Sequence, residues 1–589
     1  MKKQFKKRGQ KIIKKFSRVS QEASAKSKAH IKTHIIERVN SAKTVRLWIL
    51  EWGLLVFVIT LFAIIQTIWY RNSYETNVFV SGGSYTEATL GSINSMNPLY
   101  ATTSSEKTLA KLLFPGLLAV DTSGHLGNEL AASVSADETG KIWTAKLRSN
   151  LRWSDGEPIT ARDVVFSFDL INNPSAKTSV SSSFASVKIE TIDELTVKFV
   201  LPAAYVAFYD ALVFPIIPAH ILAEVEPALI YEHAFSTKPV TSGPFILNAV
   251  QPSANGKTIH LNKNPNYFRG SPMLNSFAIR TYNSPNEIVN ALNRLEVSAS
   301  ADLSALNSPE LTNSAIFAKK TLINSGAFAF INTMSPIFSD IRVRQALRYG
   351  IDVDILRDGL IKDARLDFPI LDNQIAIEFP ELPIHNETTA EQLLVAVGYH
   401  IEDEKLVDAQ GVQPTINIAT ITTGHLPELA TRLATQLTNL GFAVSTDIHD
   451  SSSSIQDFFA NTVRPRNYDI LLYEIDMGID PDLFPYYHSS QATATSFNFS
   501  NYKSSVVDDI LLSARTSFDQ TLRKAKYRSF LEHWINDVPA IGLYRVNLSY
   551  YFDHTSRTFS ENNILATPTD RFSDIIYWAA EKDMRRRTP

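Results

Sequence analysis

The stretch LRSNLRWSDGEPITARDVVFSFDLI, Leu147–Ile171, carries the clearest local structure signals in this chain of 589 residues. Asp155–Pro158 has the composition of a tight turn, because Asp accepts bonds from nearby backbone groups and Gly supplies a positive φ. Thr160 can cap the helix that follows, and Asp163 can bond back to the Thr160 backbone, as in a capping box. The apolar positions of that helix recur on one face: Val164, Val165 and Phe168. The stretch therefore predicts a turn and then a helix over residues 161–171 that packs on a core.

Strand-like and helix-like segments alternate on both sides of this stretch. The expected strands are Asn77–Ser81, Ile142–Leu147, Val187–Ile189, Thr196–Leu201, Phe277–Tyr282, Phe328–Asn332, Pro414–Thr420, Phe442–Asp447 and Tyr468–Glu474. The expected helices are Ser104–Phe114, Pro285–Leu295, Asp340–Tyr349 and Leu426–Leu440. This rhythm is typical of an α/β protein. Residues 72–589 are too many for one core and suit two or three lobes.

One uninterrupted apolar run, Leu47–Tyr70, separates these segments from a basic tail. As a helix, 24 residues reach roughly 36 Å, which is enough to cross a bilayer. In residues 1–46, 15 Lys and Arg stand against two Glu, a net charge of +13. Short basic flanks stay in the cytoplasm, so the tail is expected inside and the large remainder outside. The sequence predicts a single-pass protein of the cell membrane with an extracytoplasmic ectodomain.

A cleavable signal peptide is the alternative for this run. Signal sequences have a shorter apolar core and a small-residue cleavage site, whereas this run exits through Gln-Thr-Ile-Trp-Tyr. Aromatic rings lie near both ends of the run, where they favour the lipid headgroup zone. A retained anchor that contacts the lipid bilayer through residues 47–70 is therefore expected, and residues 71–77 read as a polar linker.

Composition excludes several kinds of site. The chain has no cysteine, which rules out disulfides, thiolate metal sites and a lipid-modified cysteine. Residues 72–589 carry a net charge of −16, which argues against a nucleic-acid partner. No nucleophile motif, zinc motif, phosphate-binding loop or dinucleotide fingerprint is present. No enzyme activity, cofactor or metal site is predicted.

Six ordered blocks between Gly82 and Tyr550 carry a resemblance to a known family. They are GGSYTEATLGSINSMNPLYA from Gly82, LLFPGLLAVDTSGHLGNELAASV from Leu112, the stretch Leu147–Ile171, TSGPFIL from Thr241, LNKNPNYFRG from Leu261 and FSDIRVRQALRYGID from Phe338. Together they resemble the peptide-binding (dipeptide/oligopeptide type, family 5) extracytoplasmic solute-binding proteins of ABC importers. Each block also has a structural role in turns and helices, so the blocks identify the fold rather than the ligand.

The resemblance implies a two-lobed α/β fold of the periplasmic-binding-protein-like class, with an extra subdomain in lobe one and one transmembrane helix before it. The chain is expected to cross between the lobes near Phe328–Asn332 and near Asp537–Pro539. The implied parts are a cytoplasmic tail over residues 1–46, an anchor over 47–70, a linker over 71–77, lobe I over 78–327, lobe II over 328–537, and a return to lobe I with a C-terminal tail over 538–589. A cleft between such lobes can close on a ligand by hinge bending.

The resemblance also implies ligand-binding residues. Family members carry a Gly-Trp-x-x-Asp-like stretch after a buried strand, and its aspartate pairs with the α-ammonium group of the peptide. Here Glu474-Ile475 replaces Gly-Trp and the spacing to the acid is shifted, so Asp476 leads and Glu474 and Asp480 follow. Weaker candidates are Tyr473, Tyr486 and Tyr487, for which roles in the core or the cleft wall are favoured. The group that meets a peptide carboxylate is not assigned.

Three functions remain open at this point. The first is a monomeric, membrane-tethered receptor that captures a peptide ligand and delivers it to ABC permease subunits. The second keeps the fold but binds a sugar oligomer, haem or a metal chelate. The third is a sensor or adhesion protein that has lost transport, which the long cytoplasmic tail motivates.

Overall fold

The computed structural model describes residues 17, 19–30, 46–180, 184, 186–253, 256–303, 311–360, 364–451 and 455–586. Contacts divide the chain into two compact units, one of Met1–Val78 with Lys582–Pro589 and one of Phe79–Glu581. Most of the basic tail lies outside the described residues, so its expected topology stays a prediction.

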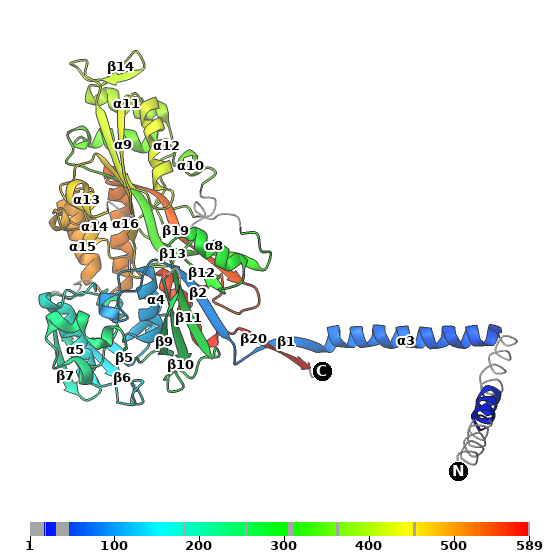
Figure 1. The fold of residues 1–589 in the computed structure, drawn as a ribbon. Helices are drawn as coiled ribbons and strands as arrows, with labels where there is room; N and C mark the ends of the chain where they lie inside the picture. The colour runs from blue at the N-terminus through cyan, green and yellow to red at the C-terminus, as the bar shows by residue number, and fades with distance from the viewer. Residues whose placement is uncertain are drawn as a thin grey trace, which may run out of the picture. The chain divides into compact units, whose positions relative to one another are not determined.

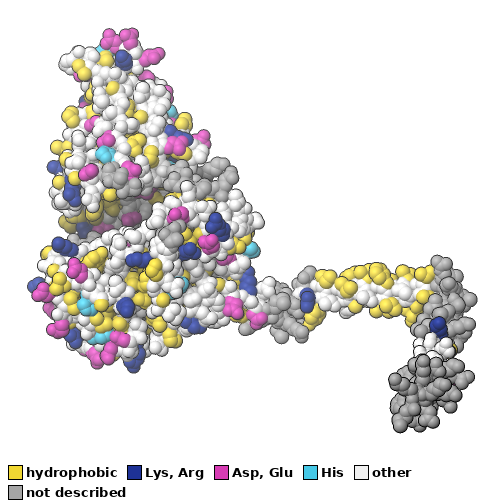
Figure 2. All heavy atoms as spheres, in the orientation of Figure 1, with side chains coloured by type: hydrophobic (Ala, Val, Ile, Leu, Met, Phe, Trp, Pro, Cys, Tyr) yellow, Lys and Arg dark blue, Asp and Glu magenta, His cyan; other side chains and the backbone are white. Residues whose placement is uncertain are grey.

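The first unit contains one long apolar helix, α3, over Arg46–Tyr74 (Figure 1). Its segment Trp48–Arg71 is long and apolar enough to cross a membrane, and none of it is buried. The hydroxyls of Thr60 and Thr67 donate to backbone oxygens one turn earlier, at 2.7 and 2.6 Å, so both are satisfied within the helix. Hydrophobic side chains cover the helix in Figure 2. The helix includes Arg71–Tyr74, which were expected in a linker, and strands β1 (Glu75–Val80) and β20 (Glu581–Arg586) pair with each other.

The second unit is built on a ten-stranded mixed sheet in the order β17-β16-β18-β13-β19-β12-β2-β11-β10-β9. These strands are β2 (Ser84–Leu90), β9 (Phe245–Ser253), β10 (Gly256–Lys263), β11 (Ser276–Tyr282), β12 (Ala299–Ser300), β13 (Ile316–Ile331), β16 (Thr415–Ile421), β17 (Ala443–His449), β18 (Ile470–Asp476) and β19 (Ala540–Asp553). The two longest strands, β13 and β19, are antiparallel neighbours at its centre. The sheet continues through both lobes (Figure 1).

The first lobe has its own hydrophobic core. Helices α4 (Ser104–Leu113) and α8 (Pro285–Asn293) contact the sheet on strands β2 and β11. A separate four-stranded sheet joins β5 (Ala131–Ala136), β6 (Ile142–Leu147), β8 (Thr196–Val200) and β7 (Lys188–Asp193). Helix α5 (Ala161–Asn172) packs on that sheet.

The opening stretch of sequence folds as predicted. Gly156 has a φ of +98° in the turn, and Val164 and Phe168 are buried in the first-lobe core. The Thr160 backbone N–H donates to Asp163 Oδ2 at 2.8 Å, which is the back-bond of a capping box. Asp163 Oδ1 also accepts from the Ala219 N–H at 2.8 Å, and this bond ties the helix to α7 (Ala219–Leu222).

The second lobe has a separate core around β16, β17 and β18. Helices α12 (Leu426–Asn439), α9 (Ile341–Gly350), α11 (Glu387–Val397), α15 (Ser505–Thr516) and α16 (Gln520–Asp537) surround it (Figure 1). The remaining elements are short: α6 (Phe208–Ala211), α10 (Val353–Arg357), α13 (Ile455–Phe458), α14 (Phe484–Tyr487), β3 (Leu118–Val120), β4 (Leu126–Asn128), β14 (His400–Glu402) and β15 (Lys405–Val407).

Strands β13 and β19 connect the two cores. On β13 Ile323 belongs to the first-lobe core and Ala327 to the second, and the β13–β19 ladder shifts register between Leu322 and Gly326. On β19 the change falls between Tyr544 and Leu548. The change of core thus precedes Phe328–Asn332 and follows Asp537–Pro539 in the chain. The lobe boundaries taken from the resemblance stay predictions.

Candidate ligand-binding cleft

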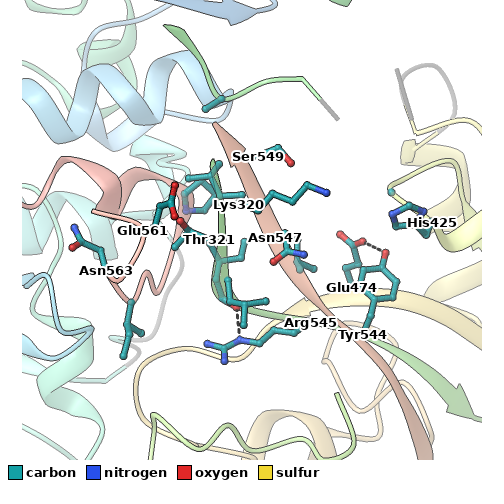
Figure 3. A pocket seen from close by; sticks show the side chains of 18 of the residues that line it. Lys320, Thr321, His425, Glu474, Tyr544, Arg545, Asn547, Ser549, Glu561 and Asn563 are labelled. Carbon is teal, nitrogen blue, oxygen red and sulfur yellow. Dashed lines mark hydrogen bonds between the residues drawn. The ribbon is translucent and has the colours of Figure 1, made fainter. Parts of the chain in front are cut away.

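A cavity of about 1080 Å³ lies where β13 and β19 pass between the lobes. Its walls come from first-lobe loops, from both connecting strands and from the second lobe (Figure 3). Its polar lining includes Lys320, Thr321, His425, Glu474, Tyr544, Arg545, Asn547, Glu561 and Asn563. A cavity this large between two lobes has the size and place of a ligand site.

The acidic group in the second-lobe wall is Glu474. The Tyr544 hydroxyl donates a hydrogen bond of 2.5 Å to Glu474 Oε1. Gly424 approaches both groups so closely that a Cβ there would lie 2.9 Å from Glu474 Oε1 and from the Tyr544 oxygen. Burial raises the pKa of Glu474, the Tyr544 hydrogen bond opposes the rise, and the charge of Asp476 adds to it. An ionised carboxylate in this position is stabilised by a cation.

Two basic residues, Lys320 and Arg545, line the cavity, but their side chains point in different directions. Arg545 is held in the connection between the lobes, since its guanidinium donates to the Ile323 oxygen at 3.0 Å and to Asn324 and Asn373 at 2.8 and 3.1 Å. Lys320 is exposed and turns toward the same space as Glu474 and His425, whereas Arg545 turns away (Figure 3). Lys320 is therefore the basic group in the described wall that is placed to meet an anionic part of a ligand.

Three buried polar atoms of the wall have no hydrogen-bond partner among the described residues: Thr321 Oγ1, His425 Nδ1 and Asn563 Nδ2. Burial lowers the pKa of His425, Glu428 opposes this and Lys320 adds to it, so the imidazole is neutral at neutral pH. Buried polar groups are normally bonded. The three residues come from β13, from the second lobe and from a first-lobe loop, so each part of the described wall holds a polar group that a solute with donors and acceptors could satisfy.

Of the predicted site residues, only Glu474 lines this cavity. Asp476 ends β18 with its side chain exposed, and Oδ1 accepts from the Ser325 hydroxyl at 2.6 Å. Asp480 is bound by Arg523, whose Nη2 lies 2.7 Å from both carboxylate oxygens. The structure thus separates the three acids into a cavity wall, a strand end and an internal ion pair.

The three predicted tyrosines do not line this cavity. Tyr473 packs against Phe459 and Phe499, with ring centroids 5.9 and 5.7 Å apart. Tyr486 donates to the Asp476 backbone oxygen at 2.7 Å. Tyr487 is fully buried in the second-lobe core. Their contact with a ligand stays a prediction.

Several wall residues have no local sequence signal. Tyr544 and Arg545 lie inside a long strand, His425 precedes a helix, and Asn563 lies in a first-lobe loop. They converge only because β13 and β19 bring both lobes to one place. The sequence gives one indication of this site, which is the pair Tyr544-Arg545 within the apolar strand β19.

A family model described as "Bacterial extracellular solute-binding proteins, family 5 Middle" matches residues 125–497. The oligopeptide-binding protein AppA of Bacillus subtilis is 24% identical over 486 residues, which cover 79% of this chain and 87% of that protein.

Solved structures share the fold. AppA of Bacillus subtilis in complex with a nonapeptide has a TM-score of 0.66 at 21% identity, covering 85% of this chain and 99% of that one. The substrate-binding protein CtaP of Listeria monocytogenes has a TM-score of 0.71 at 22% identity, covering 85% and 100%. NikZ of Campylobacter jejuni, in complex with Ni(L-His), has a TM-score of 0.68 at 22% identity, covering 84% and 99%.

The matched region runs from the first lobe through β18 of the second, and the neighbours reproduce the two-lobed α/β fold. The chain therefore belongs to the bacterial extracellular solute-binding proteins of family 5.

Proposed function

We propose that this chain is a membrane-anchored receptor that captures peptides between two closing lobes and delivers them to an ABC importer. The observation that carries the proposal is the partly buried Glu474 carboxylate in the wall of the interlobe cavity. The relatives support peptide as the solute, because AppA is an oligopeptide-binding protein and has been solved with a nonapeptide.

Glu474 is the proposed partner of the peptide α-ammonium group. It takes precedence over Asp476 and Asp480 because it lines the cavity, while Asp480 already has Arg523 as its cation. A ligand ammonium would supply the positive charge that a buried carboxylate needs. The Tyr544 hydrogen bond would orient the carboxylate toward it.

The rest of the wall suits a peptide backbone. Thr321, His425 and Asn563 have polar atoms without a partner in the described structure, and Lys320 offers a cation for a carbonyl or carboxylate group. Backbone groups are common to all peptides, so contacts of this kind give affinity with tolerance of sequence.

The apolar helix α3 supports retention in the membrane. None of its Trp48–Arg71 segment is buried, and the 15 basic residues before it favour a cytoplasmic tail. The ectodomain would then stay near a permease without a lipidated cysteine, which this chain lacks.

Isothermal titration of the full chain in detergent tests the peptide reading. The probes are a pool of tetrapeptides with free amino termini and the same pool after N-acetylation. The wild type is expected to prefer the free pool by about 10- to 100-fold, since a hydrogen-bonded charge pair contributes roughly 1.5–3 kcal/mol. Glu474→Gln should abolish this preference.

Glu561→Gln is the matched control, because Glu561 lines the same cavity but is exposed. It should keep the preference for the free pool. Asp476→Ala should reduce affinity less than Glu474→Ala. Equal binding of the two pools by the wild type would contradict the ammonium pairing, and no binding of either pool would contradict the peptide receptor.

A metal chelate is the second candidate ligand. His425 lines the cavity, and its buried Nδ1 has no hydrogen-bond partner in the described part of the chain. A neutral imidazole is a metal ligand. NikZ, with the same fold, holds Ni(L-His). Binding of Ni²⁺ with free histidine, lost in His425→Ala, would favour this reading over peptides.

Delivery to an importer is tested by its partners. Cross-linking in intact cells should recover ABC permease subunits with the full chain. Recovery of signalling or envelope proteins alone would favour a sensor or adhesion protein.

A further inference from the structure

The lobes touch a second time, away from β13 and β19. The first-lobe segment Tyr205–Asp210 meets the turn that follows β18 and the end of α15. The Val206 N–H donates to the Arg515 oxygen at 3.0 Å, and the Tyr205 hydroxyl donates to Asp482 Oδ2 at 3.0 Å. The Arg515 guanidinium lies 4.4 Å from the ring centres of Tyr205 and Phe484, one from each lobe.

An apolar contact flanks these polar bonds. Phe518 of the second lobe lies with its ring centre 5.9 Å from that of Trp143 in the first lobe. Gly140 is so close that a Cβ there would lie 2.3 Å from Phe518 Cε2. We name the whole contact the interlobe latch: Gly140, Trp143, Tyr205, Val206 and Asp210 of the first lobe, with Asp480, Asp482, Phe484, Arg515, Phe518 and Arg523 of the second.

Carboxylates from the two lobes meet at the centre of the interlobe latch. Asp210 Oδ2 accepts from the Asp480 backbone N–H at 2.7 Å. The Asp480 carboxylate is bound by Arg523, which also donates from Nε to the Ala514 oxygen at 3.0 Å. Arg515 lies 3.5 Å from Asp482. Arg523 and Arg515 thus each form an ion pair with an aspartate of the second lobe. In the described contact, the first-lobe Asp210 has no ion-pair partner.

We propose that the interlobe latch makes closure of the lobes depend on pH. Closing the lobes places Asp210 against Asp480 and Asp482, and Asp210 takes up a proton when they close. The proposal rests on the lobe closure assumed in the proposed function and adds its regulation. Acidic conditions then favour the closed, ligand-retaining form, and alkaline conditions favour opening.

The groups that face Asp210 are arranged for this. Asp480 and Asp482 come from the turn after β18, Arg523 from α16, and Tyr205 and Tyr209 from its own segment. Behind these groups, Arg515 of α15 pairs with Asp482, and Tyr527 of α16 accepts from Arg523. Burial and the charge of Asp480 raise the pKa of Asp210 to about 7, the Asp480 N–H and Arg523 oppose the rise, and Asp482 adds to it. Burial also raises the pKa of Asp480, but the charge and hydrogen bond of Arg523 oppose this rise. Arg523 Nη2 lies 2.7 Å from both Asp480 oxygens, so Asp480 has a cation beside it and Asp210 has none in the described contact.

The sign follows from the two states. In the open form Asp210 meets water and returns to the ordinary pKa of an aspartate, about 3.9. A group whose pKa is higher in the closed form favours closure below its open-form pKa and loses that advantage as pH rises toward its closed-form pKa. The ratio of closed to open molecules should fall by up to about 10-fold per pH unit between about pH 4 and 7 and level off above that.

Distances between spin labels can measure this ratio without any ligand. The chain has no cysteine, so Ile192→Cys in the first lobe and Val506→Cys in the second, both exposed positions, create the two labelling sites. Pulsed dipolar spectra of the full chain in detergent at pH 5, 6, 7 and 8 should show the short-distance population decline with pH. Asp210→Asn keeps an acceptor oxygen for the Asp480 N–H but cannot titrate, so its populations should not change with pH.

Two further variants separate the proton from the contact itself. Asp169→Asn changes another first-lobe carboxyl, outside the interlobe latch, whose pKa is raised by desolvation, and it should behave as the wild type. Tyr205→Phe removes the bond to Asp482 and should lower the closed fraction at every pH without removing the pH dependence. Wild-type distances that do not change with pH, or a pH dependence that persists in Asp210→Asn, would overturn the proposal. Since no ligand is added, neither result depends on whether peptides are the natural solute.

Discussion

Tyr544 of β19 and Glu474 of β18 are both paired in register with Ala327 of β13, which lies between them. The Tyr544 hydroxyl reaches past this small residue and donates a hydrogen bond of 2.5 Å to the Glu474 carboxylate. The three residues come from three adjacent strands of the second lobe. The hydrogen bond favours the ionised form of an acid whose burial favours the neutral one. The Tyr544 hydrogen bond thus opposes protonation of a carboxylate that lines the cavity.

Tyr544→Phe should weaken binding of the free tetrapeptide pool by about 10-fold or more at pH 6, since a hydrogen bond to a charged group contributes roughly 1.5–3 kcal/mol. Without the hydroxyl, the pKa of Glu474 should rise further. Affinity depends on ionised Glu474, so it increases as pH rises through that pKa, and the variant should need a higher pH for half-maximal affinity.

This pH dependence is best measured by titration calorimetry in an Asp210→Asn background. The proposed closure effect has the opposite sign, because it weakens binding as pH rises. A midpoint that is the same with and without the Tyr544 hydroxyl would argue against the role given to this hydrogen bond.

Gly424→Ala should reduce affinity for the same pool, because its Cβ would press on both Glu474 and Tyr544 at 2.9 Å. Gly424 also has a φ of +50°, and a left-handed conformation costs a residue with a Cβ roughly 1–2 kcal/mol. Gly411→Ala is the control, since Gly411 has a φ of +77° but open space around its Cβ position. Both variants should lose similar thermal stability, measured by differential scanning calorimetry, and only Gly424→Ala should lose affinity. Equal loss of affinity in both would assign the effect to backbone strain.

The fold was readable from sequence where local rules act. Helix α5 with its capping acid, strand β6 over Ile142–Leu147 and helix α12 over Leu426–Asn439 lie within one or two residues of their predicted ranges. Their signals are turn chemistry and periodicity, which depend on neighbours in the chain. The family resemblance then supplied the arrangement of the two lobes, which such signals do not encode.

The site was less readable, because its geometry depends on distant segments. Asp476 and Asp480 lie in the same short segment as Glu474. The register of β18 directs the Glu474 side chain into the cavity, whereas Asp480, which follows the strand, forms an ion pair with Arg523 of α16. Asp210, more than two hundred residues away, had no motif at all. Only the packing of one lobe against the other gives it acidic neighbours.

The full chain should stay in the membrane fraction after an alkaline wash. The exposed apolar segment Trp48–Arg71 is long enough to span a bilayer, and its Thr hydroxyls are satisfied by backbone oxygens of the helix. Protease added to intact spheroplasts should degrade the ectodomain and spare a small basic fragment. Recovery of a soluble product that starts after residue 70 would instead identify the run as a cleaved signal sequence.

Arg571→Met should destabilise the first lobe by about 3–5 kcal/mol, because it leaves a buried charge without its partner. Arg571 donates to Glu87 of β2, both side chains are almost fully buried, and the Tyr550 hydroxyl donates to the other Glu87 oxygen at 3.1 Å. Burial already raises the pKa of Glu87 and the Arg571 charge opposes the rise, so without Arg571 the pKa should rise further. The defect, measured as the loss of melting temperature, should therefore be smaller at pH 5 than at pH 8, where keeping Glu87 ionised costs most.

The double variant Glu87→Gln with Arg571→Met tests whether charge or packing causes this loss. It removes both charges, so it should recover part of the melting temperature at pH 8 and show little dependence on pH. Arg557→Met is the control from the same C-terminal segment, since Arg557 is exposed and donates to the Tyr577 oxygen, and it should cost no more than about 1.5 kcal/mol. The double variant could instead be less stable than Arg571→Met alone. The connection between β2 and the C-terminal segment would then depend on the hydrogen bonds and packing of the two side chains rather than on their charges.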